Sequence, residues 1–392
     1  MGEVSGIINE KIAAITPSVT LGIDNKAKDL MAKGGRIYSF AAGEPDFDTP
    51  EHIKKAAIKA LHEGQTKYTP VAGLMSLRSA IAAKLEKENG LLYSPEQVVV
   101  SNGAKHTLFN IFMAICRSGD EVVIPAPYWL SYPEMVNVAG GKSVFVHCHE
   151  DNDFKMTPDE LEKAITPRTK AVVINSPSNP IGVVYSGVEL KTLAEVAARH
   201  GVYIISDEIY EKMIYDDTVH VSIGSLSKEI FEKTITVNGF SKAYAMTGWR
   251  LGYFAGPMEV VKAVNAFQSH STSGPNTFAQ FGGIEALRGS QDCVVRMVNS
   301  FSERRSFIYQ RLISIDGITC VKPRGAFYVL PNISKFGLDS IRFAGRLLES
   351  EGVAVVPGVA FGADRNVRLS YACNMDNIRE GLDRLEKFVK AL

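Results

Sequence analysis

The stretch "KAVVINSPSNPIGVVYSGVELKTLAEVAARHGVYIISDE", residues 170–208, decides the fold class. It begins with an apolar run rich in Val and Ile over 170–177 and ends with a second such run over 201–208. Residues 187–200, between the runs, carry the apolar spacing of a helix. Continuous runs of branched apolar residues are typical of strands buried on both faces, so this stretch predicts two parallel strands joined by a helix.

The same alternation continues on both sides of this stretch. Further apolar runs lie at 97–103, 120–127 and 233–240, and helical patterns lie at 106–117 and 158–165. Thr157, Pro158 and Glu160 form a capping box at the start of the last helix. We therefore expect an α/β fold in which helices cover both sides of a mostly parallel sheet.

The two ends of the chain have a different pattern. Residues 1–45 begin with a helical pattern and continue with a stretch punctuated by Pro and Gly. A long helix is expected over 291–312, followed by short apolar runs, a helix over 339–351 and a terminal helix. These features predict a smaller α+β unit beside the main sheet.

Composition limits the function classes. The chain has 392 residues, which favours two subdomains, and its 43 Lys and Arg balance its 43 Asp and Glu. A net charge of zero argues against broad attraction to nucleic acid or to an anionic membrane. The five cysteines form no C-x-x-C pair, and the first 19 residues do not resemble a signal peptide. We expect a cytoplasmic protein without a membrane span or a metal site.

Polar side chains follow the predicted strands, at the points where the strands end. They are the turn Asn102-Gly103-Ala104-Lys105, then Asn179, then Asp207 with Tyr210, and finally Lys242. Ligands of open α/β sheets bind outside the carboxyl ends of the strands, so we expect these groups to converge. The glycine turn before a helix also suits a phosphate, because helix N-termini present unpaired N–H groups.

Each of these residues also has a simpler interpretation. Asp207 could cap the turn that follows it, Lys242 could lie on the surface, and Arg250 could pair with a nearby carboxylate. Arg368 could point outward from an alternating strand. Taken singly, the simpler interpretations are favoured, whereas the joint pattern favours a functional site.

Six motifs together resemble a known family. They are "AAGEPDF" (41–47), "KYTPVAG" (67–73), "SPSNPIG" (176–182), "SDEIYE" (206–211), "SKAYAMTGWRLGY" (241–253) and "VRLSYA" (367–372). From about residue 10 to its end, the chain resembles the fold-type I pyridoxal-phosphate aminotransferases. The resembling subgroup comprises bacterial and plant aspartate aminotransferases and includes prephenate aminotransferases. The resemblance implies a three-layer fold with a seven-stranded sheet. It also implies a large domain over 48–288 and a small domain over 289–392. Residues 1–47 would form an N-terminal arm and part of the small domain.

The resemblance assigns the chemistry to residues at the strand ends. Lys242 would join pyridoxal 5'-phosphate covalently and later move a proton between the substrate Cα and the cofactor. Asp207 would pair with the pyridine nitrogen, which keeps the ring an electron sink. Tyr210 and Asn179 would hydrogen-bond the 3-hydroxyl oxygen, with Asn179 also near the substrate.

The resemblance also assigns the phosphate contacts. Arg250 and the backbone at Gly103, Ala104 and Lys105 would hold the phosphate. Tyr68 would reach the phosphate bound by a neighbouring subunit, which implies a homodimer with shared sites.

Amino-acid and 2-oxo-acid substrates are implied as well. Trp129, in "PYWLSYP", would stack on the cofactor ring and border the substrate. Arg368 would clamp the α-carboxylate as a bidentate pair, assisted by the Gly43 backbone. Lys105 would bind the side-chain carboxylate, and Thr20 matches a position linked to prephenate, although a plain turn residue is an alternative for Thr20.

Three functions follow from this interpretation. The favoured one is an L-aspartate:2-oxoglutarate aminotransferase working by ping-pong transamination, and the alternative is a prephenate aminotransferase or a bifunctional enzyme. A catalytically silent regulator is least favoured, because Lys242, Asp207 and Arg368 are all present. Two positions depart from common patterns: Ile181 replaces a threonine, and Gly239 replaces a serine that contacts the phosphate.

Overall fold

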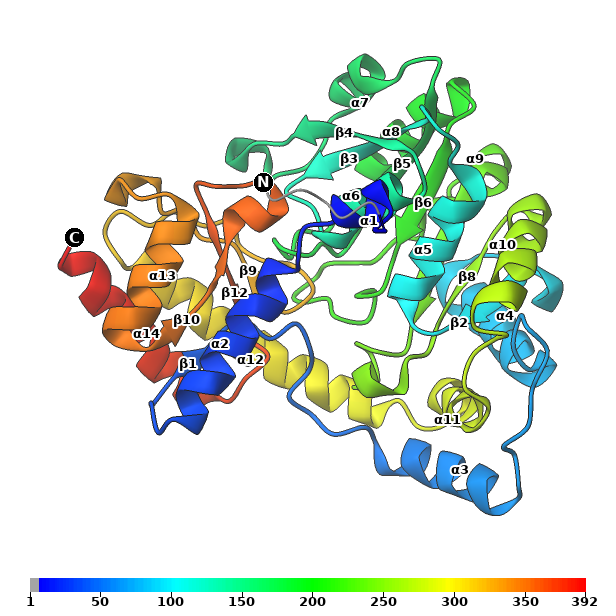
Figure 1. The fold of residues 1–392 in the computed structure, drawn as a ribbon, viewed down its shortest axis with the longest axis horizontal. Helices are drawn as coiled ribbons and strands as arrows, with labels where there is room; N and C mark the ends of the chain where they lie inside the picture. Colours follow the sequence, from blue (N-terminus) through cyan, green and yellow to red (C-terminus); the bar gives the residue numbers. More distant parts are fainter. Residues whose placement is uncertain (1–6) are drawn as a thin grey trace.

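A seven-stranded sheet forms the centre of the molecule (Figure 1). The computed structural model describes residues 7–392, so residues 1–6 of the predicted arm lie outside the described residues. The strand order is β2-β8-β7-β6-β5-β3-β4. The bounds are β2 (Val98–Ser101), β3 (Glu121–Ala126), β4 (Lys142–His147), β5 (Thr169–Asn175), β6 (Tyr203–Asp207), β7 (Thr234–Gly239) and β8 (Gly252–Ala255). Strand β8 is antiparallel to both of its neighbours, and the other six strands run in one direction.

Five of the seven strands are those that the sequence predicts, and the mostly parallel α/β fold is confirmed. Strands β4 and β8 were not predicted. Strand β4 lies at the sheet edge, so its residues are largely exposed and do not form a continuous apolar run. Strand β8 has four residues, too few for a periodic pattern to stand out.

Helices cover both faces of the sheet because successive strand residues point to opposite sides. Val122 and Ile124 of β3 belong to one core cluster, and Val123 between them belongs to another. The first cluster is covered by α5 (Ala104–Ile115), α6 (Ser131–Val138) and α10 (Met258–Ser271). The second is covered by α7 (Pro158–Ala164), α8 (Gly187–Arg199) and α9 (Lys228–Lys233).

The predicted capping box of α7 is confirmed, with the Thr157 side chain accepting from the Glu160 N–H. A further core cluster lies at the β2–β8 end of the sheet. It involves α3 (Glu51–His62), α4 (Met75–Asn89) and α11 (Thr277–Arg288).

A smaller unit combines the two ends of the chain. Its elements are α12 (Asp292–Ile313), β9 (Tyr328–Val329), α13 (Ser340–Glu351), β10 (Val353–Ala354), β11 (Val356–Pro357), β12 (Val367–Ser370) and α14 (Met375–Lys390). Strands β11, β12 and β9 form an antiparallel sheet, and β1 (Tyr38–Ser39) from the beginning of the chain pairs with β10. Figure 1 shows α2 (Val19–Ala32), in blue, beside these elements, and Ala27 of α2 packs on Leu348 and Ala354.

The arm continues before α2 as α1 (Glu10–Ala13). The division at residues 47 and 288 remains a prediction. Among residues 7–392, none of the helices combines the length and the apolar character that a membrane crossing requires.

Candidate active site

A pocket of about 410 Å³ lies where the carboxyl ends of β5, β6 and β7 meet the smaller unit. Its size is within the range of small-molecule sites. The sequence-derived candidates that line it are Thr20, Gly43, Ala104, Lys105, Trp129, Asn179, Asp207, Tyr210, Lys242, Arg250 and Arg368. Strand ends that are far apart in the sequence therefore meet at one place.

Two further candidates, Gly103 and Tyr68, do not line the pocket. Gly103 precedes the pocket residue Ala104 and has a φ of 88°, and a Cβ there would come within 2.6 Å of Nη2 of Arg250. Glycine at this position therefore lets Arg250 approach the turn. Tyr68 is 95% exposed, which places its phenol on the outside of the single chain.

Lys242 follows β7 and points into the pocket, where Nζ donates to the carbonyl of Gly43 at 2.5 Å. Burial lowers the pKa of this lysine from 10.5 to about 8. Glu44 opposes the shift, whereas nearby Arg368 and Arg250 strengthen it because like charges disfavour the ammonium form. Lys242 is therefore neutral more often at neutral pH than an exposed lysine, and its interpretation as a surface residue is wrong.

Asp207 ends β6 and is 3% exposed. Its Oδ2 accepts a hydrogen bond from the Tyr132 hydroxyl at 2.5 Å, and its Oδ1 accepts from the Ile209 N–H at 3.3 Å. Burial raises the pKa of Asp207 to about 6, although both hydrogen bonds act in the opposite direction. The capping interpretation is thus correct for Oδ1, yet the same carboxylate also borders the pocket.

The turn before α5 and Arg250 form a cationic end of the pocket. Ala104 and Lys105 are the first residues of α5, where N–H groups have no intrahelical partner, and no side chain caps this helix start. Arg250 donates to the backbone carbonyls of Thr247 at 2.8 Å and of Asn102 at 3.4 Å. No carboxylate among residues 7–392 forms an ion pair with Arg250, so the ion-pair interpretation is wrong. Burial lowers the pKa of Lys105, and the charge of Arg250 adds to the effect, as expected of a site that accepts an anion.

Arg368, on β12, is a cation enclosed by protein and only 2% exposed. Its Nη1 donates to Oδ1 of Asn179 at 3.2 Å and its Nη2 to the Ala41 carbonyl at 2.9 Å, while Nε has no partner. The guanidinium lies over the rings of Tyr328 and Phe361, at 4.5 and 5.0 Å from their centroids. The outward interpretation of Arg368 is wrong. A buried guanidinium without a carboxylate partner among the described residues suits the carboxylate of a ligand.

The remaining candidates complete the walls of the pocket. Nζ of Lys105 lies 5.1 Å from the centroid of the Trp129 ring. The Asn179 N–H donates to Oδ1 of Asn175 at 2.8 Å. Thr20 is the second residue of α2 and its buried Oγ1 has no hydrogen-bond partner, so the interpretation as a turn residue is wrong.

Tyr132, Asn175 and Tyr328 are among the pocket residues that the sequence does not predict. Tyr132 lies three positions after Trp129, in a motif that was already singled out. Asn175 is the last residue of β5, and its side chain donates to the Asp207 carbonyl at 2.9 Å. The Tyr328 hydroxyl shares a hydrogen bond with the Tyr210 hydroxyl at 2.9 Å. Asn175 could have been found as a strand end, whereas the other two depend on contacts that sequence spacing does not encode.

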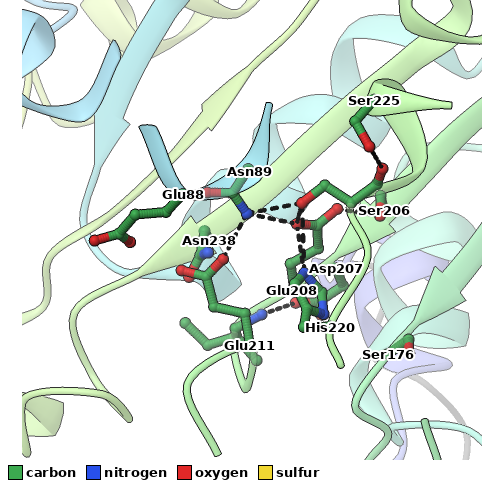
Figure 2. Close-up of polar contacts among 12 residues, drawn as sticks. Glu88, Asn89, Ser176, Ser206, Asp207, Glu208, Glu211, His220, Ser225 and Asn238 are labelled. Atoms are coloured by element: carbon green, nitrogen blue, oxygen red, sulfur yellow. Dashed lines mark hydrogen bonds and ion pairs between the residues drawn. The ribbon is translucent and has the colours of Figure 1, made fainter. Parts of the chain in front are cut away.

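A buried polar network binds the side of the 207–211 segment that faces away from the pocket (Figure 2). Glu208 accepts hydrogen bonds from Ser206 at 2.8 Å and Ser222 at 2.6 Å, and it pairs with His220 at 3.1 Å. Glu211 accepts from Asn89 at 2.7 Å and forms an ion pair with the buried Lys84.

This network holds the segment in place because residues next to each other in the segment face opposite ways. Asp207 and Tyr210 border the pocket, whereas Glu208 and Glu211 are tied to α4 and to residues 220–222. Removing one partner of a buried ion pair leaves the other charge buried without a partner, which destabilises the fold by about 3–5 kcal/mol. Lys84 supplies the positive charge beside Glu211, whereas Glu208 pairs with His220.

The chain is similar over nearly its full length to proteins of one known family. The chain matches the family described as Aminotransferase class I and II over residues 36–385. It is 50% identical over 387 residues to the aspartate aminotransferase of Geobacillus stearothermophilus, covering 97% of this chain and 98% of that protein. It is 46% identical over 383 residues to the aspartate/prephenate aminotransferase of Thermus thermophilus, with coverage of 97% and 98%. The structure of Thermus thermophilus aspartate aminotransferase with maleate superposes with a TM-score of 0.94 at 46% identity, covering 97% of this chain and 99% of that one.

Proposed function

This chain belongs to the class I and II aminotransferase family and is therefore a transaminase, and from that premise we propose that it transfers the amino group of L-aspartate to 2-oxoglutarate with pyridoxal 5'-phosphate as its cofactor. The observation that carries the proposal is the position of Lys242, Asp207 and Arg368 around one pocket. These are an amine, a buried carboxylate and a buried cation whose Nε has no partner. We expect the enzyme to work in the cytoplasm as a homodimer.

The residues of the pocket fit this cofactor. The start of α5 and Arg250 offer N–H groups and positive charge to its phosphate, and Gly103 keeps the turn free of a Cβ. Asp207 offers a buried carboxylate to its ring nitrogen, and Trp129 offers an aromatic face to its ring. When bound, pyridoxal 5'-phosphate supplies an aldehyde that exchanges amines and a ring that draws electrons away from the substrate Cα.

Lys242 would provide both the nucleophile and the proton carrier. Its pKa of about 8 leaves part of the amine neutral, as attack on an aldehyde requires. Once displaced by the substrate amine, Nζ would accept the proton from the substrate Cα and deliver it to the cofactor, and it would move a proton in the reverse direction when the acceptor acid is bound. The carbonyl of Gly43 gives the amine a fixed position between these steps.

Other side chains would hold the reacting groups in place. The ionised Asp207 would keep a proton on the ring nitrogen, and Tyr210 with Asn179 would hydrogen-bond the 3-hydroxyl oxygen. The exposed phenol of Tyr68 would complete the phosphate site of a neighbouring subunit. The proposal therefore includes a homodimer in which each site contains residues of both subunits.

The substrate would be bound through its carboxylates. Arg368 can offer two N–H groups in a bidentate pair to the α-carboxylate, and Lys105 lies in the same pocket for the side-chain carboxylate. Aspartate would leave its amine and depart as oxaloacetate, after which 2-oxoglutarate would enter through the same contacts and collect the amine.

Prephenate is a second candidate acceptor because of Thr20. The buried Oγ1 of Thr20 has no partner in the chain, and it lies in the same pocket as Lys105. A larger oxo acid with a second carboxylate could use both groups. Relatives at 46% identity carry the name aspartate/prephenate aminotransferase.

The test is a comparison of two half-reactions. The purified enzyme is converted to its aminated cofactor form, and the return of the original absorbance is timed with oxaloacetate and, separately, with prephenate. Fast return with oxaloacetate alone supports a dedicated aspartate enzyme, and comparable or faster return with prephenate supports the second candidate. Arg368→Gln should slow both half-reactions, because both acceptors carry an α-carboxylate. Failure of the wild-type enzyme to react with either acid would contradict both candidates.

A further inference from the structure

We propose that the Tyr132 hydroxyl keeps the Asp207 carboxylate ionised and aimed at the ring nitrogen of the bound cofactor, which makes Tyr132 a positioning residue of the reaction. This inference rests on the proposed function, because it assigns Asp207 to that nitrogen. It is based on the contact at 2.5 Å between the tyrosine hydroxyl and Oδ2 of Asp207.

The position of Tyr132 is fixed by its surroundings. It is the second residue of α6, it is 2% exposed, and it belongs to the core cluster on that face of the sheet. Its ring meets Trp129 edge to face, with centroids 5.2 Å apart and planes at 86°. A phenol packed in this way cannot turn away from Asp207 without disturbing the core.

The other groups around Asp207 cannot replace this hydrogen bond. The Ile209 N–H reaches Oδ1 only at 3.3 Å. Glu208, on the same segment, disfavours the ionised form of Asp207, whereas Lys242, after β7, favours it. Lys242 must be neutral to act as a nucleophile. It therefore stabilises the ionised form of Asp207 only while its amine is protonated. Tyr210 completes the charged and titratable surroundings, and its phenol is engaged with Tyr328.

Tyr132, by contrast, remains a donor throughout the reaction. Burial and the neighbouring Asp207 raise the pKa of its phenol well above the usual value of 10.0, so the hydroxyl keeps its proton. A carboxylate that accepts a strong hydrogen bond is a weaker base. The proton shared between Asp207 and the ring nitrogen therefore stays on the nitrogen. Without the hydroxyl, that single proton would move to the carboxylate and leave a neutral ring.

The experiment follows this proton directly. Wild type and Tyr132→Phe are loaded with cofactor labelled with ¹⁵N in the ring, and the chemical shift of the nitrogen is compared. We expect a protonated nitrogen in the wild type and a shift toward the unprotonated value in the variant. The matched control is Tyr93→Phe, which removes another buried hydroxyl that donates to the Thr234 carbonyl at 3.4 Å, at the opposite end of β7. That control should keep the wild-type shift.

Cofactor affinity of the apoenzyme, measured by tryptophan quenching, gives a second readout. Affinity should fall as the pH drops through the pKa of Asp207, about 6 in the wild type, because the carboxylate then becomes neutral. In Tyr132→Phe the midpoint should move up by about one pH unit, so binding at the wild-type midpoint weakens by about fivefold. The Tyr93→Phe midpoint should equal that of the wild type.

The possible outcomes separate this inference from the proposed function. A wild type that binds no cofactor, or whose ring nitrogen is unprotonated, contradicts the role of Asp207 itself. A protonated wild type together with an unchanged Tyr132→Phe overturns only the role of Tyr132. If Tyr132→Phe does not fold, the ring nitrogen is measured in Tyr132→His instead, because the imidazole N–H can donate to Oδ2 of Asp207. A protonated ring in that variant supports the inference, and an unprotonated one counts against it.

Discussion

Lys242 has its low pKa mainly because it is enclosed, and secondarily because other cations lie near it. The rate at which the apoenzyme captures its cofactor covalently should therefore rise as the pH increases through about 8, since only the neutral amine attacks. Arg368→Gln removes one neighbouring positive charge and should move this midpoint upward. Stopped-flow absorbance over a pH series measures both midpoints.

The control for this prediction is Arg311→Gln. Arg311 lies in α12 and pairs with Asp383 and Glu386 of α14. Loss of its charge should leave the midpoint of cofactor capture where it is. Equal shifts in the two variants would mean that net charge, rather than the local field in the pocket, sets the pKa of Lys242.

Asp207 provides a second test at the level of a single side chain. Asp207→Asn keeps the shape of the side chain but cannot hold a positive charge on the ring nitrogen, so kcat should fall by several orders of magnitude. Steady-state kinetics with aspartate and 2-oxoglutarate give the value, and circular dichroism checks the fold. A loss of less than about tenfold, or ~1.4 kcal/mol, would remove the ring nitrogen as the main catalytic contact.

Single residues at strand ends were predictable from sequence, whereas their partners were not. Asp207 lies at the end of one apolar run and Lys242 lies two residues after another, so the end of each run marks them. Tyr132 lies inside a helix, and nothing in its local pattern indicates that it meets Asp207, which is 75 residues away in the chain. The same holds for Lys84 and Glu211, whose ion pair joins α4 to the segment after β6.

At the level of elements, the close packing of β8 against the start of α5 sets the geometry of the cationic end. A Cβ on Gly252 would lie 2.2 Å from the Ala104 nitrogen and 2.5 Å from the Gly103 carbonyl carbon. Gly252→Ala should therefore displace the N–H groups of α5, weaken cofactor binding and destabilise the fold by about 1–3 kcal/mol. Urea unfolding and cofactor titration measure the two effects.

Gly248→Ala is the matched control, because no atom lies within 4 Å of the added Cβ and the position lies in the same stretch of chain. It should leave both the urea midpoint and cofactor binding close to those of the wild type. Equal losses in Gly248→Ala and Gly252→Ala would argue that flexibility of the stretch, and not crowding against α5, determines binding.

Elements with strong periodicity were predicted, and those that depend on pairing were not. The strand–helix–strand unit over 170–208 appears as β5, α8 and β6, close to the expected bounds. Strand β8 exists because β2 and β7 hold it on both sides, and a run of four residues does not indicate such partners. Thr20 lies in the first turn of a helix because α2 packs on the smaller unit, a contact that the local sequence does not specify.

For the whole molecule, the exposed Tyr68 leads to a prediction about assembly. Lys242→Ala should abolish nearly all turnover, and Tyr68→Ala should lower the activity by weakening the phosphate site of the neighbouring subunit. Mixing the two variants under conditions that exchange subunits should restore activity, because each hybrid dimer then contains one intact site. Activity of the mixture is compared with that of each variant alone.

Restoration depends on the site being shared. If Tyr68 served the pocket of its own chain, every hybrid site would keep one defect and mixing would restore nothing. The mixture of wild type with Lys242→Ala calibrates how completely the subunits exchange.

The pocket draws its walls from two separate parts of the chain. Lys242, Asp207 and Arg250 come from the middle, whereas Thr20, Gly43 and Arg368 come from the two ends that form the smaller unit. Randomising positions of the end segments other than Gly43 and Arg368, which act on Lys242, should therefore change substrate choice while keeping the central chemistry. The same separation allows descendants of one gene to evolve different substrate specificities while they keep the same catalytic residues.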